Sequence, residues 1–408
     1  MSGVKNNIWV GWVRERQKQS LIHSSTLSVI ATHSLTHSLT HRPTRTHPIR
    51  VDNWKEEGRA RIDIVPKGYV DLSKDTSIVF DDTQSKRFHT YASIMTRKIQ
   101  ELSRCEIDVG ASSKKNKICL QIINKIEHEE GYSIMKDRSN STYYISGKTD
   151  RGVLFGVGRF LRDVMNVEFY QSYGTSLQKR CVAPEEVRIV SSPDYRMRQH
   201  QIAYRPKTNA YDAFTAQQMR DEVTDLALFG TNGIEMIPPG IDDALQSPHF
   251  TISWTKMLHV VSEWCDLLDV NVSMWYPAFF KNYDDPDTSI KAEAHWNEIF
   301  SSLKRLDVLF VPGGDPGGRA APEFFNVVER QSKFLRSRFF PACEVWVSSQ
   351  YGLSTSVDLG LSDRWIPLER ELEWMRLINS SRVRKFVNVR IVLECVNISI
   401  SLYTHAHT

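Results

Sequence analysis

Between residues 197 and 378, short apolar runs alternate regularly with longer amphipathic stretches. The short runs are typical of strands whose two faces are both covered. The longer stretches repeat their apolar residues at the three- and four-residue spacing of helices. The pattern predicts five strand–helix units. The predicted strands are 197–204, 232–239, 270–277, 307–315 and 343–352, and the predicted helices are 213–230, 253–269, 289–306, 321–339 and 367–378.

Repeated units of this kind occur in open doubly wound sheets and in closed (β/α)₈ barrels. No Gly-x-Gly-x-x-Gly follows the first predicted strand, so the signature of a dinucleotide-binding open sheet is missing. Each predicted strand instead ends in a polar, aromatic or Pro/Gly-rich loop, as at the catalytic rim of a barrel. We therefore expect residues 191–378 to form the first five units of a TIM-type barrel, with the C-terminal part of the barrel missing.

Residues 59–190 have a different, mixed pattern that predicts a small α/β sandwich domain. The expected elements are a strand at 77–82, a helix at 88–103, a strand at 117–124, a hairpin at 131–150 and a helix at 151–165. Residues 187–198 are then expected to link this domain to the barrel. The predicted fold class is thus α/β, with a small sandwich domain followed by a partial (β/α)₈ barrel.

The two ends of the chain do not fit either domain. Residues 1–58 are expected to be a disordered or artefactual tail, and within them 32–48 form a low-complexity, histidine-rich repeat. Such a tract can bind metal, and the alternatives are disorder or translated non-coding sequence. Residues 379–408 end in a β-prone run without a sequel, and we expect a tail that is foreign to the fold.

Composition excludes several classes of function. The chain has 408 residues, 41% of them hydrophobic, and its net charge of +4 comes from an excess of basic residues in the first 50 positions. The remainder is close to neutral, so no nucleic-acid-binding surface is indicated. No apolar run reaches the roughly 18 residues of a membrane span, so no membrane partner is expected. The six cysteines lack Cys-x-x-Cys spacing, and neither a structural metal nor an organic cofactor is predicted.

An ordered series of residues in the first domain and at its end resembles glycoside hydrolases. The series consists of Gly131, Tyr132, Gly147, Arg151, Gly152, Leu154, Gly156, Leu161 and Arg162, followed by Pro193, Arg196 and Arg198. It is similar to the N-terminal domain, and its join to a (β/α)₈ barrel, in α-glucuronidases (family 67) and β-N-acetylhexosaminidases (family 20). The resemblance covers roughly residues 60–378. It implies a glycosidase that binds an oligosaccharide or polysaccharide at the C-terminal ends of the barrel strands.

Two carboxylates are the candidate catalytic residues, since glycoside hydrolysis usually needs a pair of them. Asp315, in the glycine-rich stretch 309–318, lies where the related barrels carry their acid. The resemblance implies an Asp-Glu pair at this point for the hexosaminidases and a Glu for the α-glucuronidases. The sequence departs from both patterns, since it has an Asp followed by Pro316. The alternative role of Asp315 is to cap amides of a local turn. Glu235 is predicted as a second carboxylate or as an acceptor for sugar hydroxyls; alternatively it pairs with Arg198 or another buried cation.

The remaining candidates are expected to bind the sugar at the ends of strands one, three and five. They are His200, Tyr204, Arg205, Trp275, Tyr276, Gln350 and Tyr351. The aromatic side chains suit stacking on a sugar ring, although aromatic residues in strands are more often part of the core. An arginine suits the carboxylate of a uronic acid or a structural ion pair. His200 is alternatively an ordinary strand histidine.

The predicted function is that of a glycoside hydrolase-like protein. It would cleave terminal glycosidic bonds of polysaccharides by carboxylate acid/base catalysis, or descend from enzymes that do. The alternative is a catalytically inactive carbohydrate-binding homologue. A third reading, a phosphate-ester enzyme using residues 313–318, lacks the Lys-Ser/Thr of a phosphate-binding loop. The sequence leaves open the sugar, the stereochemical outcome and the oligomeric state. Localisation is also open: the related families include secreted enzymes, but residues 20–31 form no clear signal peptide.

Overall fold

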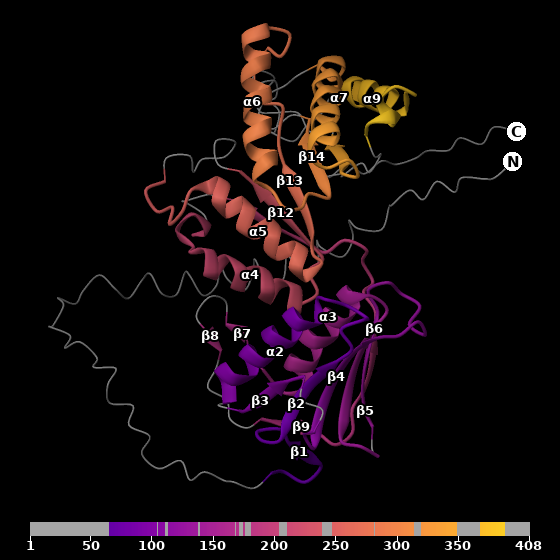
Figure 1. The fold of residues 1–408 in the computed structure, drawn as a ribbon. Helices are drawn as coiled ribbons and strands as arrows, with labels where there is room; N and C mark the ends of the chain where they lie inside the picture. Colours follow the sequence, from indigo (N-terminus) through magenta and orange to yellow (C-terminus); the bar gives the residue numbers. More distant parts are fainter. Residues whose placement is uncertain are drawn as a thin grey trace, which may run out of the picture. The chain divides into compact units, whose positions relative to one another are not determined.

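Two sheets with helices packed on them make up the structure (Figure 1), which is a computed structural model. It describes residues 65–103, 105–110, 113–137, 139–167, 169–170, 174–175, 181–203, 210–238, 247–280, 282–313, 320–348 and 368–387. All of these belong to a single unit of the chain, Val65–Val396. Both sheets combine with helices, which confirms the predicted α/β class.

The first sheet has six strands in the order β10-β5-β6-β4-β2-β3. In chain order these are β2 (Thr76–Phe80), β3 (Ile107–Val109), β4 (Asn116–Ile122), β5 (Tyr132–Asp137), β6 (Thr142–Gly147) and β10 (Arg188–Ser191). β5 and β6 pair antiparallel with Tyr132 opposite Gly147, which confirms the expected hairpin. β10 corrects the sequence prediction, because this part of the expected linker pairs antiparallel with β5.

Two helices cover one side of this sheet, as Figure 1 shows. α2 (Phe88–Ser103) has the predicted bounds. The helix predicted at 151–165 is instead α3 (Asp150–Arg159) followed by the π-helical turn η2 (Phe160–Val164). The side chain of Thr149 caps α3 by accepting from the Gly152 amide, which explains why the helix begins there. Two small pairs complete this part: β1 (Tyr69–Asp71) with β9 (Val182–Pro184), and β7 (Phe169–Tyr170) with β8 (Gly174–Thr175).

The second sheet is parallel, with the order β11-β12-β13-β14-β15. Its strands are β11 (Gln199–Ala203), β12 (Gly233–Ile237), β13 (Asn271–Trp275), β14 (Val308–Pro312) and β15 (Glu344–Ser348). The helices are η3 (Tyr211–Ala213), α4 (Ala216–Leu228), α5 (Trp254–Leu268), α6 (Pro286–Ser302), α7 (Ala321–Arg338), α9 (Leu368–Asn379) and η4 (Val383–Lys385). All five predicted strand–helix units are present. Within the described ranges the sheet does not close into a barrel.

Capping residues set where the helices of the second sheet begin. Thr215 and Gln218 form a reciprocal capping box at the start of α4, and Ser253 caps α5. Asp285 caps α6, and Pro286 occupies its first turn. The helix α6 therefore begins three residues before its predicted start. Its first turn is polar, and hydrophobic periodicity does not detect a polar turn.

The two faces of the second sheet carry different side chains. Ile234, Met236, Val272, Val311 and Val345 lie on the helix side and are at most 2% exposed, as part of the main core. The opposite face would be the inner face of a barrel. It carries a separate apolar cluster, which consists of Ala203, Ile237, Trp275, Val308, Phe310 and Trp346. A functional site on the inner face is therefore separated by the sheet from the helix-side core.

The C-terminal described segment belongs to this core. Trp374 of α9 is fully buried, and Val383, Phe386 and Val387 are at most 6% exposed. Residues 379–387, which the sequence analysis assigned to a foreign tail, therefore pack on the second sheet's helices.

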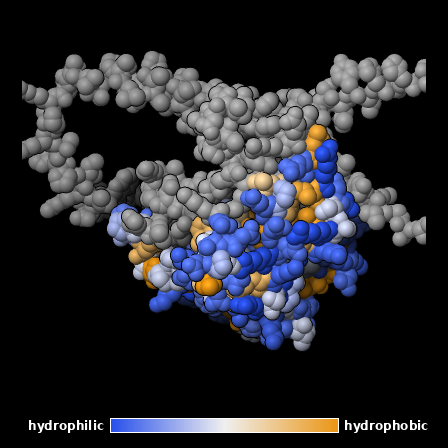
Figure 2. Space-filling view, turned by 90° about the horizontal axis from the view of Figure 1, so that it is seen from above, coloured by the Kyte–Doolittle hydropathy of each residue, from blue (hydrophilic) through white to orange (hydrophobic). Residues whose placement is uncertain are grey.

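Hydrophilic residues prevail on the coloured part of the face in Figure 2, with hydrophobic residues scattered among them. Scattered apolar residues are normal on a protein surface. No helix in the described ranges has both the length and the apolar character required to span a bilayer.

Candidate functional site

The inner face of the second sheet, near the C-terminal ends of its strands, is where the sequence analysis places the site. Asp315, Tyr204, Arg205, Gln350 and Tyr351 lie outside the described residues. The described candidates are Glu235, His200, Trp275 and Tyr276, and their placement decides how much of the predicted constellation comes together.

Glu235 and Trp275 share the inner face. In the parallel register Glu235 lies opposite Ser273 on the neighbouring strand, and Trp275 is two residues further along that strand. Since side chains alternate along a strand, Ser273 and Trp275 point to the same side. The sheet thus brings together one predicted carboxylate and one predicted aromatic residue.

Two glutamines hold the Glu235 carboxylate. Gln199 Nε2 donates to its Oε2 at 3.0 Å, and Gln201 Nε2 donates to its Oε1 at 2.7 Å. The residue is 8% exposed. The glutamines are its neighbours because Gln201 is directly opposite Glu235 in the register of β11 and β12. Two donors directed at the two oxygens match an ionised carboxylate, which accepts hydrogen bonds and donates none.

The alternative that Glu235 pairs with Arg198 is wrong. Arg198 Nη2 instead donates to Glu130 Oε2 at 2.6 Å. Glu235 is also not the last inward residue of its strand, because Ile237 follows it on the same face and belongs to the apolar cluster. The carboxylate therefore lies one side-chain layer below the C-terminal edge of the sheet.

An aromatic row crosses the inner face above this layer. Trp275 lies opposite Phe310, and Phe310 lies opposite Trp346. Trp346 Nε1 donates to Glu344 Oε2 at 2.8 Å, so the indole has a fixed orientation. Phe310, Glu344 and Trp346 were missed from the sequence. The strand sequence "EVWVS" could have revealed Trp346, because alternation along the strand puts it on the same face as Glu344.

His200 lies on the helix side of the sheet, away from Glu235 and Trp275. Its Nε2 is 3.0 Å from the Tyr211 hydroxyl, which in turn donates to Glu222 Oε1 of α4 at 3.4 Å. Burial and the neighbouring Glu222 carboxylate raise the pKa of Tyr211 to about 12. These contacts join β11 to η3 and α4, which agrees with the alternative of an ordinary strand histidine.

Tyr276 also lies on the helix side. It is fully buried, and its hydroxyl hydrogen-bonds to His295 Nδ1 of α6. Its ring packs against Phe279 and Phe300. Burial raises the pKa of Tyr276 and lowers the pKa of His295, so both side chains are neutral near pH 7. Tyr276 and Trp275 are therefore adjacent in sequence but belong to opposite faces.

Gly313 begins the glycine-rich loop after β14, and its lack of a side chain serves packing. A Cβ atom at this position would lie 2.7 Å from the Trp374 ring and collide with the Ser348 carbonyl oxygen. At Gly313 the space is occupied by the chain itself, and the rest of the loop, 314–319, lies outside the described residues.

Two arginines of the glycoside-hydrolase resemblance, Arg151 and Arg198, lie at the junction between the two sheets. Glu130 accepts from Arg151 at 3.1 Å, from Arg198 at 2.6 Å and from Asn232 at 2.9 Å. Arg151 also donates to the Asp269 carbonyl at 2.6 Å. Burial opposes ionisation of Glu130, but the three hydrogen bonds outweigh it and lower its pKa. These two arginines thus fix where the second sheet is attached.

A glycine of α3 completes this junction. At Gly158 a Cβ atom would collide with the carbonyl group of Leu228, the last residue of α4. The helix backbones can approach this closely only without a side chain.

Metal binding finds no support in the described ranges, where no group of three or more His, Cys, Asp or Glu side chains is placed to hold an ion. The histidine-rich tract 32–48 lies outside them.

No protein-family model and no curated protein sequence matches the chain. Its fold matches that of solved glycoside hydrolases of the β-hexosaminidase type, which confirms the resemblance to that group. The N-acetyl-β-hexosaminidase of Streptomyces plicatus in complex with Thio-NAglucal has a TM-score of 0.52 and 11% sequence identity. A mutant of the β-hexosaminidase from the same organism, in complex with its product GlcNAc, has a TM-score of 0.51 and the same identity. In both comparisons 69% of this chain is covered, and it spans 63% of the other chain.

Proposed function

We propose that this chain is a glycoside hydrolase-like protein that binds the terminal sugar of a polysaccharide at the C-terminal edge of the second sheet. The observation that carries the proposal is the shared inner face of Glu235 and Trp275 in a fold similar to that of β-hexosaminidases. Residues 191–378 would be the first part of a TIM-type barrel, and the sugar would lie above the aromatic row. The neighbours' complexes with GlcNAc and a thio-sugar support an exo-acting site for a single terminal residue.

Asp315 and Glu235 take different roles in this proposal. Asp315 follows β14 by three residues and would be the acid that protonates the leaving oxygen. Glu235, which accepts hydrogen bonds from Gln199 and Gln201, would orient a sugar hydroxyl or the attacking water from below. Tyr204, Arg205, Gln350 and Tyr351, predicted at the ends of the first and fifth strands, would contact the substrate.

The alternative is a homologue that binds carbohydrate without cleaving it. The glutamine clamp favours this reading, because both oxygens of Glu235 already accept a hydrogen bond within the chain. The layer of Ile237 and Trp275 above the carboxylate also separates it from the edge.

A panel of aryl glycosides tests the proposal on the full chain. The parent protein is expected to release aryl alcohol from at least one terminal sugar. Asp315→Asn should lower kcat by about 100-fold or more, as loss of a general acid does. The control is Asp287→Asn, an equal change at an exposed position in the first turn of α6, which should leave kcat unchanged.

Equal rates for Asp315→Asn and the parent would remove Asp315 from the mechanism. Binding of a sugar by the parent without any hydrolysis would decide for the non-catalytic homologue.

A further inference from the structure

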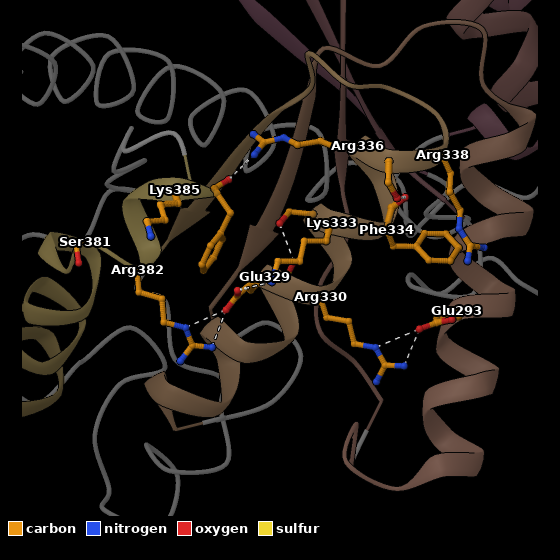
Figure 3. A pocket seen from close by; sticks show the side chains of 13 residues that line it. Glu293, Glu329, Arg330, Lys333, Phe334, Arg336, Arg338, Ser381, Arg382 and Lys385 are labelled. Carbon is orange, nitrogen blue, oxygen red and sulfur yellow. Dashed lines mark hydrogen bonds and ion pairs between the residues drawn. The ribbon is translucent and has the colours of Figure 1, made fainter.

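A cavity lies on the helix side of the second sheet, away from the inner face. It has a volume of about 930 Å³ and opens between α7 and the segment that follows α9. Figure 3 shows Arg382 and Lys385 of that segment on one side, and Arg336 and Arg338 of α7 on the other. The size falls in the range of small-ligand sites.

Positive charge dominates the lining of this cavity. The charged residues that line it are Arg330, Lys333, Arg336, Arg338, Arg382 and Lys385, with Glu293 and Glu329 as the acidic ones. The rest of the chain beyond the first 50 residues is close to neutral, so this excess is a local feature rather than a general property of the surface.

Ion pairs within the cavity leave part of the charge uncompensated. Arg330 pairs with Glu293 at 2.7 Å, and Glu329 accepts from Lys333 at 2.7 Å and from Arg382 at 2.6 Å. Two cations share one carboxylate there, and their hydrogen bonds lower the pKa of Glu329. Within the described ranges Lys385 has no ion pair, and Arg338 stacks on the Phe334 ring with its guanidinium 4.2 Å from the ring centroid.

The cations are spread along the cavity. Arg330 and Arg338 are eight residues apart on α7, which is about 12 Å along a helix axis. A single phosphate or sulfate spans only a small part of this distance. A linear ligand with several separated acidic groups can contact both ends and pack an apolar ring face on the Phe334–Arg338 stack.

We propose that this cavity, the basic cavity of α7, binds an acidic oligosaccharide through its carboxylate or sulfate groups. The charge pattern identifies a linear polyanion. The choice of a carbohydrate rests on the proposed function. The cavity would hold a charged stretch of the same polysaccharide at a distance from the terminal residue at the inner face.

The test is calorimetric titration of the full chain with a short polygalacturonate oligomer, with a neutral cello-oligomer of equal length as the ligand control. Polygalacturonate should bind and lose affinity with added salt, since screening weakens exposed charge contacts. Lys385→Gln should weaken binding about fivefold, and Arg338→Gln by a similar factor. Arg384→Gln is the matched control. It removes the same charge one residue away, at an exposed side chain that bonds to Asn379 and does not line the cavity.

Equal weakening by Lys385→Gln and Arg384→Gln would overturn the site, as would equal binding of the neutral oligomer. Titrations with inorganic phosphate and with a single-stranded oligonucleotide test whether the cavity prefers another class of anion. If either binds more tightly than polygalacturonate, the carbohydrate assignment is overturned. Asp315→Asn is expected to bind polygalacturonate like the parent, so that loss of hydrolysis and loss of this binding are distinguishable.

Discussion

At the scale of single residues, Trp275 and Tyr276 are neighbours in sequence with opposite environments. Trp275 belongs to the inner-face cluster, whereas Tyr276 hydrogen-bonds to His295 on the helix side. We expect Trp275→Phe to weaken binding of a terminal sugar several-fold, because it shortens the aromatic row. Tyr276→Phe should leave sugar affinity unchanged and lower the free energy of unfolding by about 1 kcal/mol, the usual loss of one hydrogen bond. Sugar titration and urea unfolding of both variants measure the two effects. A change of sugar affinity in Tyr276→Phe alone would reverse this assignment of faces.

Glu235 allows a second test at the residue scale. In Glu235→Gln the new amide supplies one acceptor oxygen for two glutamine donors. Gln199 and Gln201 are exposed, so one of them can turn its amide oxygen toward the new amide group and pair with it again. We therefore expect the free energy of unfolding to fall by only about 1 kcal/mol, through the loss of the charge-assisted hydrogen bonds. Urea unfolding measures it, with Glu263→Gln at the half-exposed surface of α5 as the control. If Glu235→Gln abolished sugar binding without lowering stability, the clamp would be part of the sugar site rather than a structural device.

At the scale of elements, hydrophobic periodicity predicted α2, the hairpin of β5 and β6 and all five strand–helix units. It succeeded there because the helices are long and periodic, and because the strands between them are distinct apolar runs. β10 was missed because it has only four residues and depends on pairing with β5. The orientation of side chains was harder. In β13 the polar Asn271 and Ser273 alternate with the apolar Val272 and Met274. This alternation assigns Trp275 and Tyr276 to opposite faces, but the expectation that both bind the sugar rested on residue type alone. The glutamine clamp of Glu235 arises only from the register between β11 and β12, which a single sequence does not encode.

The close contact of α3 with the end of α4 gives an element-scale prediction. Gly158→Ala places a methyl group against the Leu228 carbonyl, so the helices must separate or the turn must distort. We expect destabilisation of more than about 3 kcal/mol, as for other severe steric changes in a core. The control is Gly233→Ala in β12, where the nearest atom to an added Cβ is 3.5 Å away and the change should be mild. Thermal unfolding of both variants compares them, and equal stability would show that the two helices are not held in this contact.

At the scale of the whole described unit, polar contacts join the first sheet and its helices to the second. Glu130 and Arg151 come from the first part of the chain, and Arg198 and Asn232 from the second. α2 adds ion pairs to α4, including Lys98 with Asp225 at 2.6 Å. Removal of one partner of a buried ion pair leaves the other charge unpaired, and this destabilises the fold by more than the pair itself stabilises it. The residues of this junction therefore depend on one another.

Glu130 makes the junction sensitive to acid. Its pKa is lowered in the folded state from the ordinary value of 4.5, so its contribution to stability is present above pH 4.5 and is lost as pH falls through the folded pKa. Burial raises the pKa of the Asp225 carboxyl, which changes stability with pH in the opposite direction. The pH dependence of the parent protein's free energy of unfolding therefore does not isolate the contribution of Glu130. The difference between the parent and Glu130→Gln does. We expect it to be about 3 kcal/mol near neutral pH and to shrink as pH falls to about 3. Urea unfolding at several pH values measures this difference, and a gap that stayed constant over the whole acidic range would mean that the charge of Glu130 does not hold the two sheets together.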